Sequence, residues 1–220
     1  METRRVYSET LPHADLVRPR TIELLARHGL EVVLAVRPWD VRGLPDVART
    51  LRDAGVPLSV WPMLSDDEGR WASVHNAAAF ARLTATVCDA LEAAGAPPRD
   101  VLFDLEPPFA QARTLASAAG AAGGKGLAQL AMSLTRAPAP PFAAASRALA
   151  QTVDEIHARG ITTSMAVWPL VALDPPGGEA WQSLLGTPVD ALAAGHVSVM
   201  MYTSILEGWS RGPLRRRDTT

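Results

Sequence analysis

Two acidic side chains at the end of one apolar segment are the strongest indication of chemistry in this sequence. Residues 100–106 read Asp-Val-Leu-Phe-Asp-Leu-Glu, and two prolines follow. Side chains alternate along a strand, so Asp104 and Glu106 are expected to share one face with Leu102. Burying two carboxyl groups costs free energy unless they are paired or serve a reaction. The pattern predicts a catalytic carboxyl pair at a strand end, where parallel α/β folds place their active sites.

The elements that would position this pair alternate regularly along the chain. Apolar runs predict strands at residues 6–11, 30–36, 56–61, 101–106, 161–167 and 197–202, and helical stretches lie at 19–28, 41–54, 74–94 and 142–159. In the second helix, Leu44, Val47, Ala48 and Leu51 recur at helical spacing, and Gly55 is expected to cap its end. Strands that alternate with helices predict βαβ units and a parallel sheet.

The fold class that fits best is a (β/α)8 TIM-barrel-like domain, of which about six βα units can be counted. We expect one domain over residues 1–220, with an insertion at about 107–141 after the fourth strand. A complete barrel of this type needs about 250 residues, so a C-terminally truncated barrel is expected. An open doubly wound sheet is the alternative, although no Gly-x-Gly-x-x-Gly follows the first strand.

A second motif ends the sixth predicted strand, where residues 197–202 read Val-Ser-Val-Met-Met-Tyr. Alternation places Met200 and Tyr202 on one face, so the phenol is expected at the same end of the sheet as Glu106. An Asp-x-Glu after the fourth strand and a Met-x-Tyr after the sixth resemble the family 18 glycoside hydrolases, the chitinase-like barrels. The resemblance implies that Glu106 is the general acid and that Asp104 orients the acetamido group of the substrate. It also implies that Tyr202 hydrogen-bonds this group, whose carbonyl oxygen is the nucleophile.

Tryptophans at strand ends indicate a sugar-binding surface. Three of them stand beside proline at the end of a predicted strand or just after it, and indole rings stack on the apolar faces of sugars. The expected substrate-binding residues are Arg37, Trp39, Trp61, Trp168 and Met200. Arg70 and Trp71, in the acidic loop after the third strand, are further candidates for the rim of a saccharide groove.

Two other functions remain open at this stage. Leu102 stands where the chitinase-like family has an inner Asp, and Thr203 follows the tyrosine where the family has Asp. A catalytically inactive saccharide-binding barrel is therefore one alternative. The other is a metal-dependent TIM-barrel enzyme in which Glu9, Asp104 and Glu106 supply the oxygen ligands that Mg²⁺ or Mn²⁺ prefers.

Composition narrows the classes of partner. The net charge is −2, and the one basic run, at residues 211–217, contains no aromatic residue, so no nucleic-acid partner is expected. Cys88 is the single cysteine, which excludes an internal disulfide and a multi-cysteine metal site. Neither a cofactor nor a metal is expected, nor a membrane span, because no apolar run reaches about 18 residues. The expected partner is a carbohydrate, and the oligomeric state is left open. Without a signal-peptide core the default location is cytoplasmic, or secreted if a longer parent carries a signal.

Overall fold

Six parallel strands form a single sheet in the computed structural model, which describes residues 4–113 and 141–201. Their order in the sheet follows their order in the chain, and each pairs in parallel with the next. The strands are β1 (Arg4–Ser8), β2 (Leu30–Val36), β3 (Leu58–Pro62), β4 (Asp100–Leu105), β5 (Thr162–Val167) and β6 (His196–Val199).

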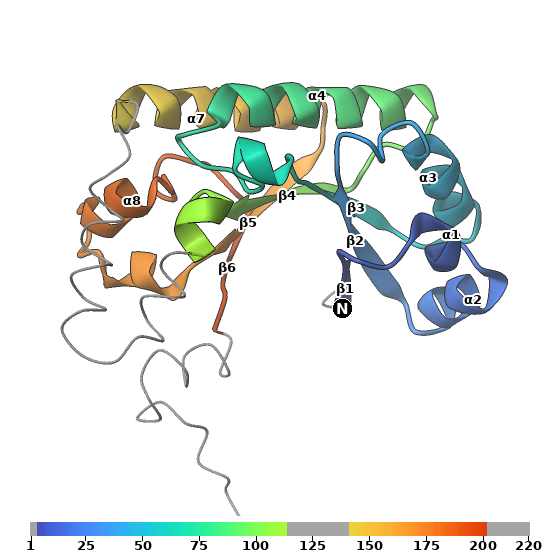
Figure 1. Ribbon diagram of the computed structural model, residues 1–220. Coiled ribbons are helices and arrows are strands. Elements are labelled where there is room, and N and C mark those ends of the chain that lie inside the picture. Colours follow the sequence, from blue (N-terminus) through green and yellow to red (C-terminus); the bar gives the residue numbers. More distant parts are fainter. Residues whose placement is uncertain (1–3, 114–140, 202–220) are drawn as a thin grey trace, which may run out of the picture.

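Helices connect the strands and lie along the outer side of the curved sheet (Figure 1). They are α1 (His13–Leu16), α2 (Pro19–Arg27), α3 (Leu44–Asp53), α4 (Ala77–Ala93), α7 (Phe142–Ala158) and α8 (Ala180–Leu185), with short 3-10 turns η1 (Asp66–Glu68) and η2 (Pro169–Leu173). The longest, α4 and α7, run side by side over the middle of the sheet. Among the described residues, no helix combines the length and the apolar character that crossing a membrane requires.

The two faces of the sheet differ in chemistry. Side chains on the outer face, such as Leu34, Val60, Phe103 and Met165, are buried in the core under the helices. Helix α3 contributes the four apolar residues that its spacing predicted, and all four are buried. The inner face instead carries polar and aromatic side chains, which sets it apart as the face that can bind a ligand.

A buried polar layer on the inner face shows how strongly the sheet curls. Arg5 of β1 lies 3.1 Å from Glu31 of the adjacent strand and 3.3 Å from Asp100 of β4. It also donates a hydrogen bond to Ser164 of β5. In a flat sheet β1 and β5 would lie about 19 Å apart, at about 4.8 Å per strand, which no arginine side chain can bridge. The described residues thus form a curled half-barrel with β1 facing β4 and β5 across its interior.

The sequence prediction of a TIM-barrel-like α/β fold with about six βα units is confirmed. Sequential strand order and helices on the outer side contradict the doubly wound alternative, which has helices on both faces of the sheet. The predicted helices and strands are present with shifted ends, and helices α1 and α8 were not predicted. The first strand ends at Ser8 rather than residue 11, so Glu9 belongs to the loop after it. The single-domain boundary and the insertion at 107–141 stay predictions, since residues 114–140 lie outside the described part.

Candidate active site

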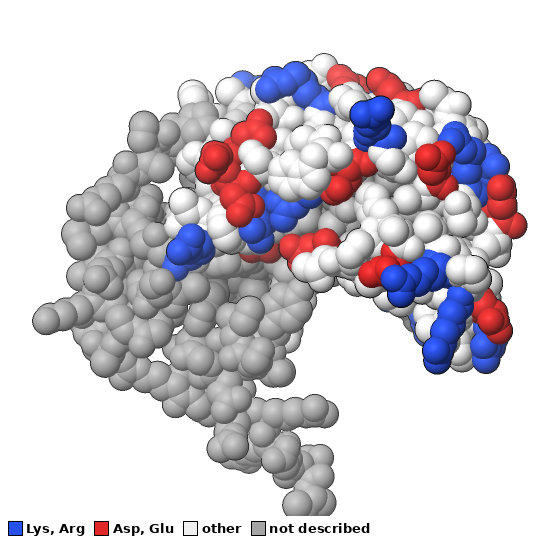
Figure 2. Space-filling view, turned by 45° about the vertical axis from the view of Figure 1, so that its right-hand side comes forward, with Lys and Arg blue, Asp and Glu red and all other residues white. Residues whose placement is uncertain are grey.

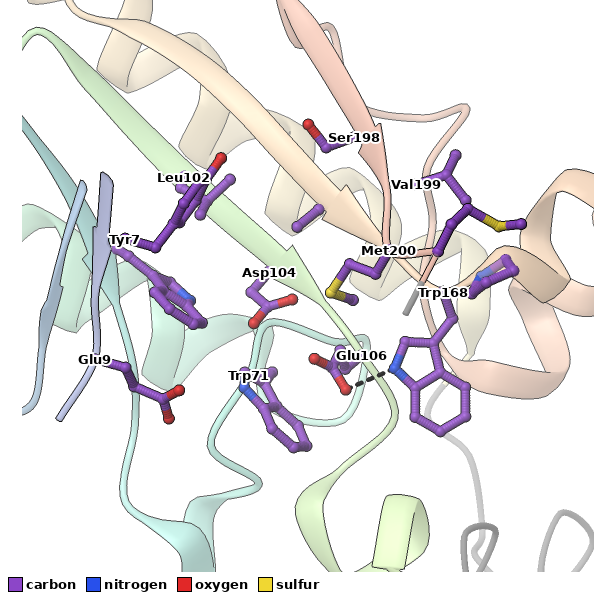
Figure 3. Close-up of a pocket in the computed structure, with 14 residues that line it drawn as sticks. Tyr7, Glu9, Trp71, Leu102, Asp104, Glu106, Trp168, Ser198, Val199 and Met200 are labelled. Atoms are coloured by element: carbon purple, nitrogen blue, oxygen red, sulfur yellow. Dashed lines mark hydrogen bonds between the residues drawn. The ribbon is translucent and has the colours of Figure 1, made fainter. Parts of the chain in front are cut away.

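A cavity of about 690 Å³ opens on the inner face at the carboxyl ends of the strands (Figure 3). Residues from β1, β3, β4, β5 and β6 and from the loops that follow these strands line it. They are Tyr7, Glu9, Trp61, Trp71, Leu102, Asp104, Glu106, Ala166, Trp168, Pro169, Ser198, Val199, Met200 and Met201. This is the end at which parallel α/β barrels bind their ligands.

Asp104 and Glu106 form the polar centre of this cavity. Both extend from β4 and its end toward the cavity, as alternation along the strand requires (Figure 3). They are 3% and 9% exposed, so both carboxyl groups are almost fully withdrawn from water. The indole N–H of Trp168, just after β5, donates a 2.6 Å hydrogen bond to Glu106 Oε2. That bond fixes the orientation of the Glu106 carboxyl group in an otherwise aromatic surrounding.

Burial raises the pKa of both carboxyl groups. For Glu106, burial is the largest effect and raises the pKa to about 7, although hydrogen bonds from Trp168 and Asp104 lower it. For Asp104, burial, the charge of Glu106 and their mutual hydrogen bond raise the pKa well above its ordinary value. Both shifts favour the protonated carboxyl groups, and the two side chains are hydrogen-bonded to each other. The pair can hold and release a proton near neutrality, which is what a general acid requires.

Two further charged residues shift the pKa of the carboxyl groups with opposite signs. Glu9, in the loop after β1, raises the pKa of both carboxyl groups through its negative charge. Arg70 acts in the other direction on Glu106, because its positive charge favours the ionised carboxylate. Glu9 and Glu106 lie on opposite sides of the cavity, with Trp71 at its lower edge (Figure 3).

The loop between β3 and α4 is folded back to carry Trp71 to the carboxyl pair. The N–H of Ala72 donates to the Asp104 carbonyl, which adds a bridge beside the end of β4. Asn76 stabilises this loop from within: its side chain donates to the carbonyls of Glu68 and Trp71 and accepts from Ser73. These bonds satisfy the loop's backbone groups without a regular helix or strand.

Gly69 and Arg70 in the same loop adopt left-handed backbone conformations, with φ of 99° and 62°. A Cβ at Gly69 would lie 2.9 Å from the Asn76 side-chain nitrogen, so only glycine fits there. Arg70 carries a side chain and adopts the same conformation. Left-handed non-glycine residues are uncommon and cluster at functional sites. The strained backbone directs the Arg70 guanidinium over the Phe109 ring, 3.8 Å from its centroid.

Aromatic rings form the walls around the carboxyl pair. Tyr7 and Trp61 meet edge to face with centroids 6.5 Å apart, and Trp71 contacts Phe109 in the same way at 5.7 Å. The indole nitrogen of Trp61 is buried and has no acceptor among the described residues. Its N–H is therefore available to a ligand that enters the cavity.

The structure brings together most, but not all, of the residues that the sequence suggested. Asp104, Glu106, Trp61, Trp168 and Met200 line the cavity. Arg37 and Trp39 line a neighbouring cavity instead, and Tyr202 lies outside the described residues.

Tyr7 is a lining residue that sequence reasoning missed. It precedes Glu9 by two positions, and the alternation used for Asp104 and Glu106 would have placed both on the inner face. Tyr7 lies within the strand predicted at residues 6–11, but the alternation was not applied to that strand.

The metal-binding alternative finds no preformed site in this geometry. Over residues 4–113 and 141–201, no three His, Cys, Asp or Glu side chains converge closely enough to hold a metal ion. Glu9 acts on Asp104 and Glu106 through its charge, whereas those two carboxyl groups are also hydrogen-bonded to each other.

Comparison with known proteins leaves the family open. No protein-family model matches the chain, and no curated protein sequence matches it. Among solved structures, D-allulose 3-epimerase from Methylomonas sp. aligns at 14% identity and a TM-score of 0.45, over 97% of this chain. The chain spans 61% of that epimerase chain. The same epimerase in complex with D-allulose aligns at 15% identity and a TM-score of 0.46, over 90% of this chain and 72% of the epimerase.

An HpcH/HpaI aldolase/citrate lyase family protein from Burkholderia cenocepacia aligns at 14% identity and a TM-score of 0.30, over 95% of this chain and 92% of its own. The fold assignment therefore rests on strand order and the curl of the sheet. Together, fold and site define a parallel (β/α) half-barrel with a buried carboxyl pair in an aromatic cavity.

Proposed function

We propose that this chain is a glycoside hydrolase in which Glu106 protonates the oxygen of the leaving group. The observation that carries the proposal is the state of Glu106: a buried carboxyl group with a pKa near 7, oriented by Trp168 inside an aromatic cavity. A group with this pKa is protonated often enough at neutral pH to act as an acid and can still release its proton.

The cavity suits a carbohydrate in both shape and chemistry. Tyr7, Trp61, Trp71 and Trp168 offer apolar rings, while the carboxyl pair and the Trp61 N–H offer hydrogen-bonding groups. Sugars present the same combination, with apolar ring faces and hydroxyl edges. A volume of about 690 Å³ also lies within the range of small-molecule sites.

The mutual hydrogen bond of Asp104 and Glu106 restricts the mechanism. In two-carboxylate hydrolysis the acids flank the scissile bond with their carboxyl groups at least about 5 Å apart. Asp104 and Glu106 extend from the same strand and are hydrogen-bonded to each other, so we do not assign Asp104 as an opposing nucleophile. A nucleophile supplied by the substrate, with Asp104 orienting it, fits this arrangement, as the resemblance to chitinase-like barrels implies.

A binding-only barrel remains the second candidate because of one observation. Leu102 lies on the inner face beside Asp104 and lines the cavity, so an apolar side chain occupies the position of the family's inner Asp. An apolar side chain at that position can neither hydrogen-bond to Asp104 nor exchange a proton with it.

Hydrolysis of N-acetylglucosamine oligosaccharides and of their 4-nitrophenyl glycosides by wild-type protein and Glu106→Gln tests the proposal. For the oligosaccharides, kcat/KM should fall by about 100-fold or more, the usual contribution of a general acid. For 4-nitrophenyl glycosides the fall should be smaller, because nitrophenolate leaves without a proton. Glu155→Gln, on the exposed face of α7, is the matched control and should behave as wild type. Equal rates of Glu106→Gln and wild-type protein on oligosaccharides would contradict the proposal, and binding without turnover by wild-type protein would favour the second candidate.

A further inference from the structure

A second cavity, of about 650 Å³, adjoins the first at the ends of β1 and β2. Glu9 lines both cavities, so the two are neighbours along the same mouth of the half-barrel. The loops after β1, β2 and β3 supply most of its remaining residues, among them Arg37, Trp39, Asp40, Asp66 and Arg70.

Two arginines in this cavity are oriented by hydrogen bonds within the protein and retain further N–H groups that could bind a ligand. Arg37 donates through Nη1 to the Leu64 carbonyl and to Asp66. Arg70 donates through Nε and Nη2 to the two oxygens of the same Asp66. Arg37 Nη2 and Arg70 Nη1 have no acceptor among the described residues. Because both guanidinium groups are already oriented, they can bind a ligand oxygen with little further loss of side-chain entropy.

The charge of the second cavity favours a neutral ligand. Its two arginines face three carboxylates, those of Glu9, Asp40 and Asp66, which leaves a net charge of about −1 from these groups. On the face shown in Figure 2, acidic and basic side chains are likewise interspersed in small groups. An anionic ligand would be repelled, whereas a hydroxyl group can accept from an arginine and donate to a carboxylate.

Trp39 supplies an apolar surface next to these polar groups. Its side chain is 66% exposed, which is unusual for so large an apolar residue. The Arg37 guanidinium lies 5.8 Å from the centre of its ring and limits its movement. An exposed, oriented indole beside donors and acceptors is the combination that binds a sugar ring.

We propose that the second cavity is a subsite for further sugar units of the same neutral glycan, so that the substrate is an oligosaccharide. This inference rests on the proposed function, because it assumes a sugar unit at Glu106. One end of the glycan occupies the cavity of Glu106, and the chain passes Glu9 to reach Trp39, Arg37 and Arg70. Arg70, on its left-handed backbone, lines the second cavity, and its positive charge also acts on Glu106 in the first.

Calorimetric titration of N-acetylglucosamine oligomers with two to six units tests the subsite. The titration uses Glu106→Gln, so that turnover does not interfere, and compares it with Glu106→Gln/Trp39→Ala and Glu106→Gln/Trp39→Phe. We expect the tetramer to bind more tightly than the dimer. Trp39→Ala should weaken tetramer binding about tenfold and change dimer binding less than twofold, while Trp39→Phe should retain most of the affinity.

The outcomes separate the subsite from the proposed function. Equal affinity for all lengths, or an equal effect of Trp39→Ala on dimer and tetramer, overturns the subsite and leaves the site at Glu106 standing. Tighter binding of an acidic oligomer, tetragalacturonate, than of the neutral tetramer overturns the assignment of a neutral glycan. If no length binds, the proposed function itself fails, and the subsite fails with it.

Discussion

Replacing Glu106 by Gln should stabilise the folded protein at alkaline pH, although it removes the proposed catalytic group. A buried carboxyl group with a raised pKa holds its proton more tightly in the folded chain than in the unfolded chain. At low pH both states are protonated and the group has no effect. As pH rises from about 4.5 toward 7, the unfolded chain releases the proton first, so the free energy of unfolding falls.

The size of this effect follows from the two pKa values. A change from 4.5 in the unfolded chain to about 7 in the folded chain, at about 1.4 kcal/mol per tenfold change in proton affinity, amounts to about 3 kcal/mol. Glutamine carries no charge at any pH and avoids this cost. Its side-chain oxygen can also still accept the hydrogen bond from Trp168. The variant should therefore exceed wild-type protein by about 3 kcal/mol at pH 8 and match it near pH 4.

Urea unfolding at pH 4, 6 and 8, followed by circular dichroism, measures the difference directly. Glu155→Gln serves as the control, since it removes an exposed glutamate and should change stability by less than about 0.5 kcal/mol at each pH. A difference between Glu106→Gln and wild-type protein that stays constant from pH 4 to pH 8 would refute the reasoning. Glu106 would then titrate at the same pH in the folded and unfolded chains.

Three further substitutions test the surroundings of the site. Trp168→Phe removes the N–H donor that lowers the pKa of Glu106, so the alkaline limb of the pH–activity profile, where the acid loses its proton, should move to higher pH; a shift to lower pH would contradict the assigned bond. Phe103→Ala removes a fully buried ring whose centroid lies 5.1 Å from that of Phe80. The free energy of unfolding measured in urea should fall by about 3–5 kcal/mol, and a fall of less than about 1 kcal/mol would show that the ring is not in the core. Arg5→Leu leaves Glu31 and Asp100 buried without the arginine that they share. The free energy of unfolding at pH 7 should fall by about 3 kcal/mol, and an unchanged melting curve would mean that β1 does not face β4.

The strand that carries the carboxyl pair was predictable because its information is local. Asp104 and Glu106 lie two positions apart in an apolar run, and alternation alone places them on one face. Helix α3 was predictable for the same reason, since Leu44 and Leu51 recur at helical spacing and both are buried. Such patterns depend on the period of one element and not on what packs against it.

The contacts that complete the site were not predictable, because they join distant parts of the chain. Trp71 reaches the carboxyl pair only through a loop held by Asn76, and nothing in the loop's composition indicates those hydrogen bonds. Arg37 and Trp39 follow the end of β2, where the direction of a side chain depends on the loop backbone and no longer on alternation. The predicted sugar-binding residues were therefore divided between two cavities, a division that only the folded chain shows.

The most direct test of the central claim is the pH titration of the Glu106 carboxyl group by carbon-13 NMR. Glutamate labelled at the carboxyl carbon makes each glutamate visible, and loss of one signal in Glu106→Gln assigns it. A raised pKa of about 7 for Glu106 is the result that this account predicts. A value near 4.5, the ordinary value for glutamate, would mean that the group is ionised at neutral pH and would contradict its role as the acid.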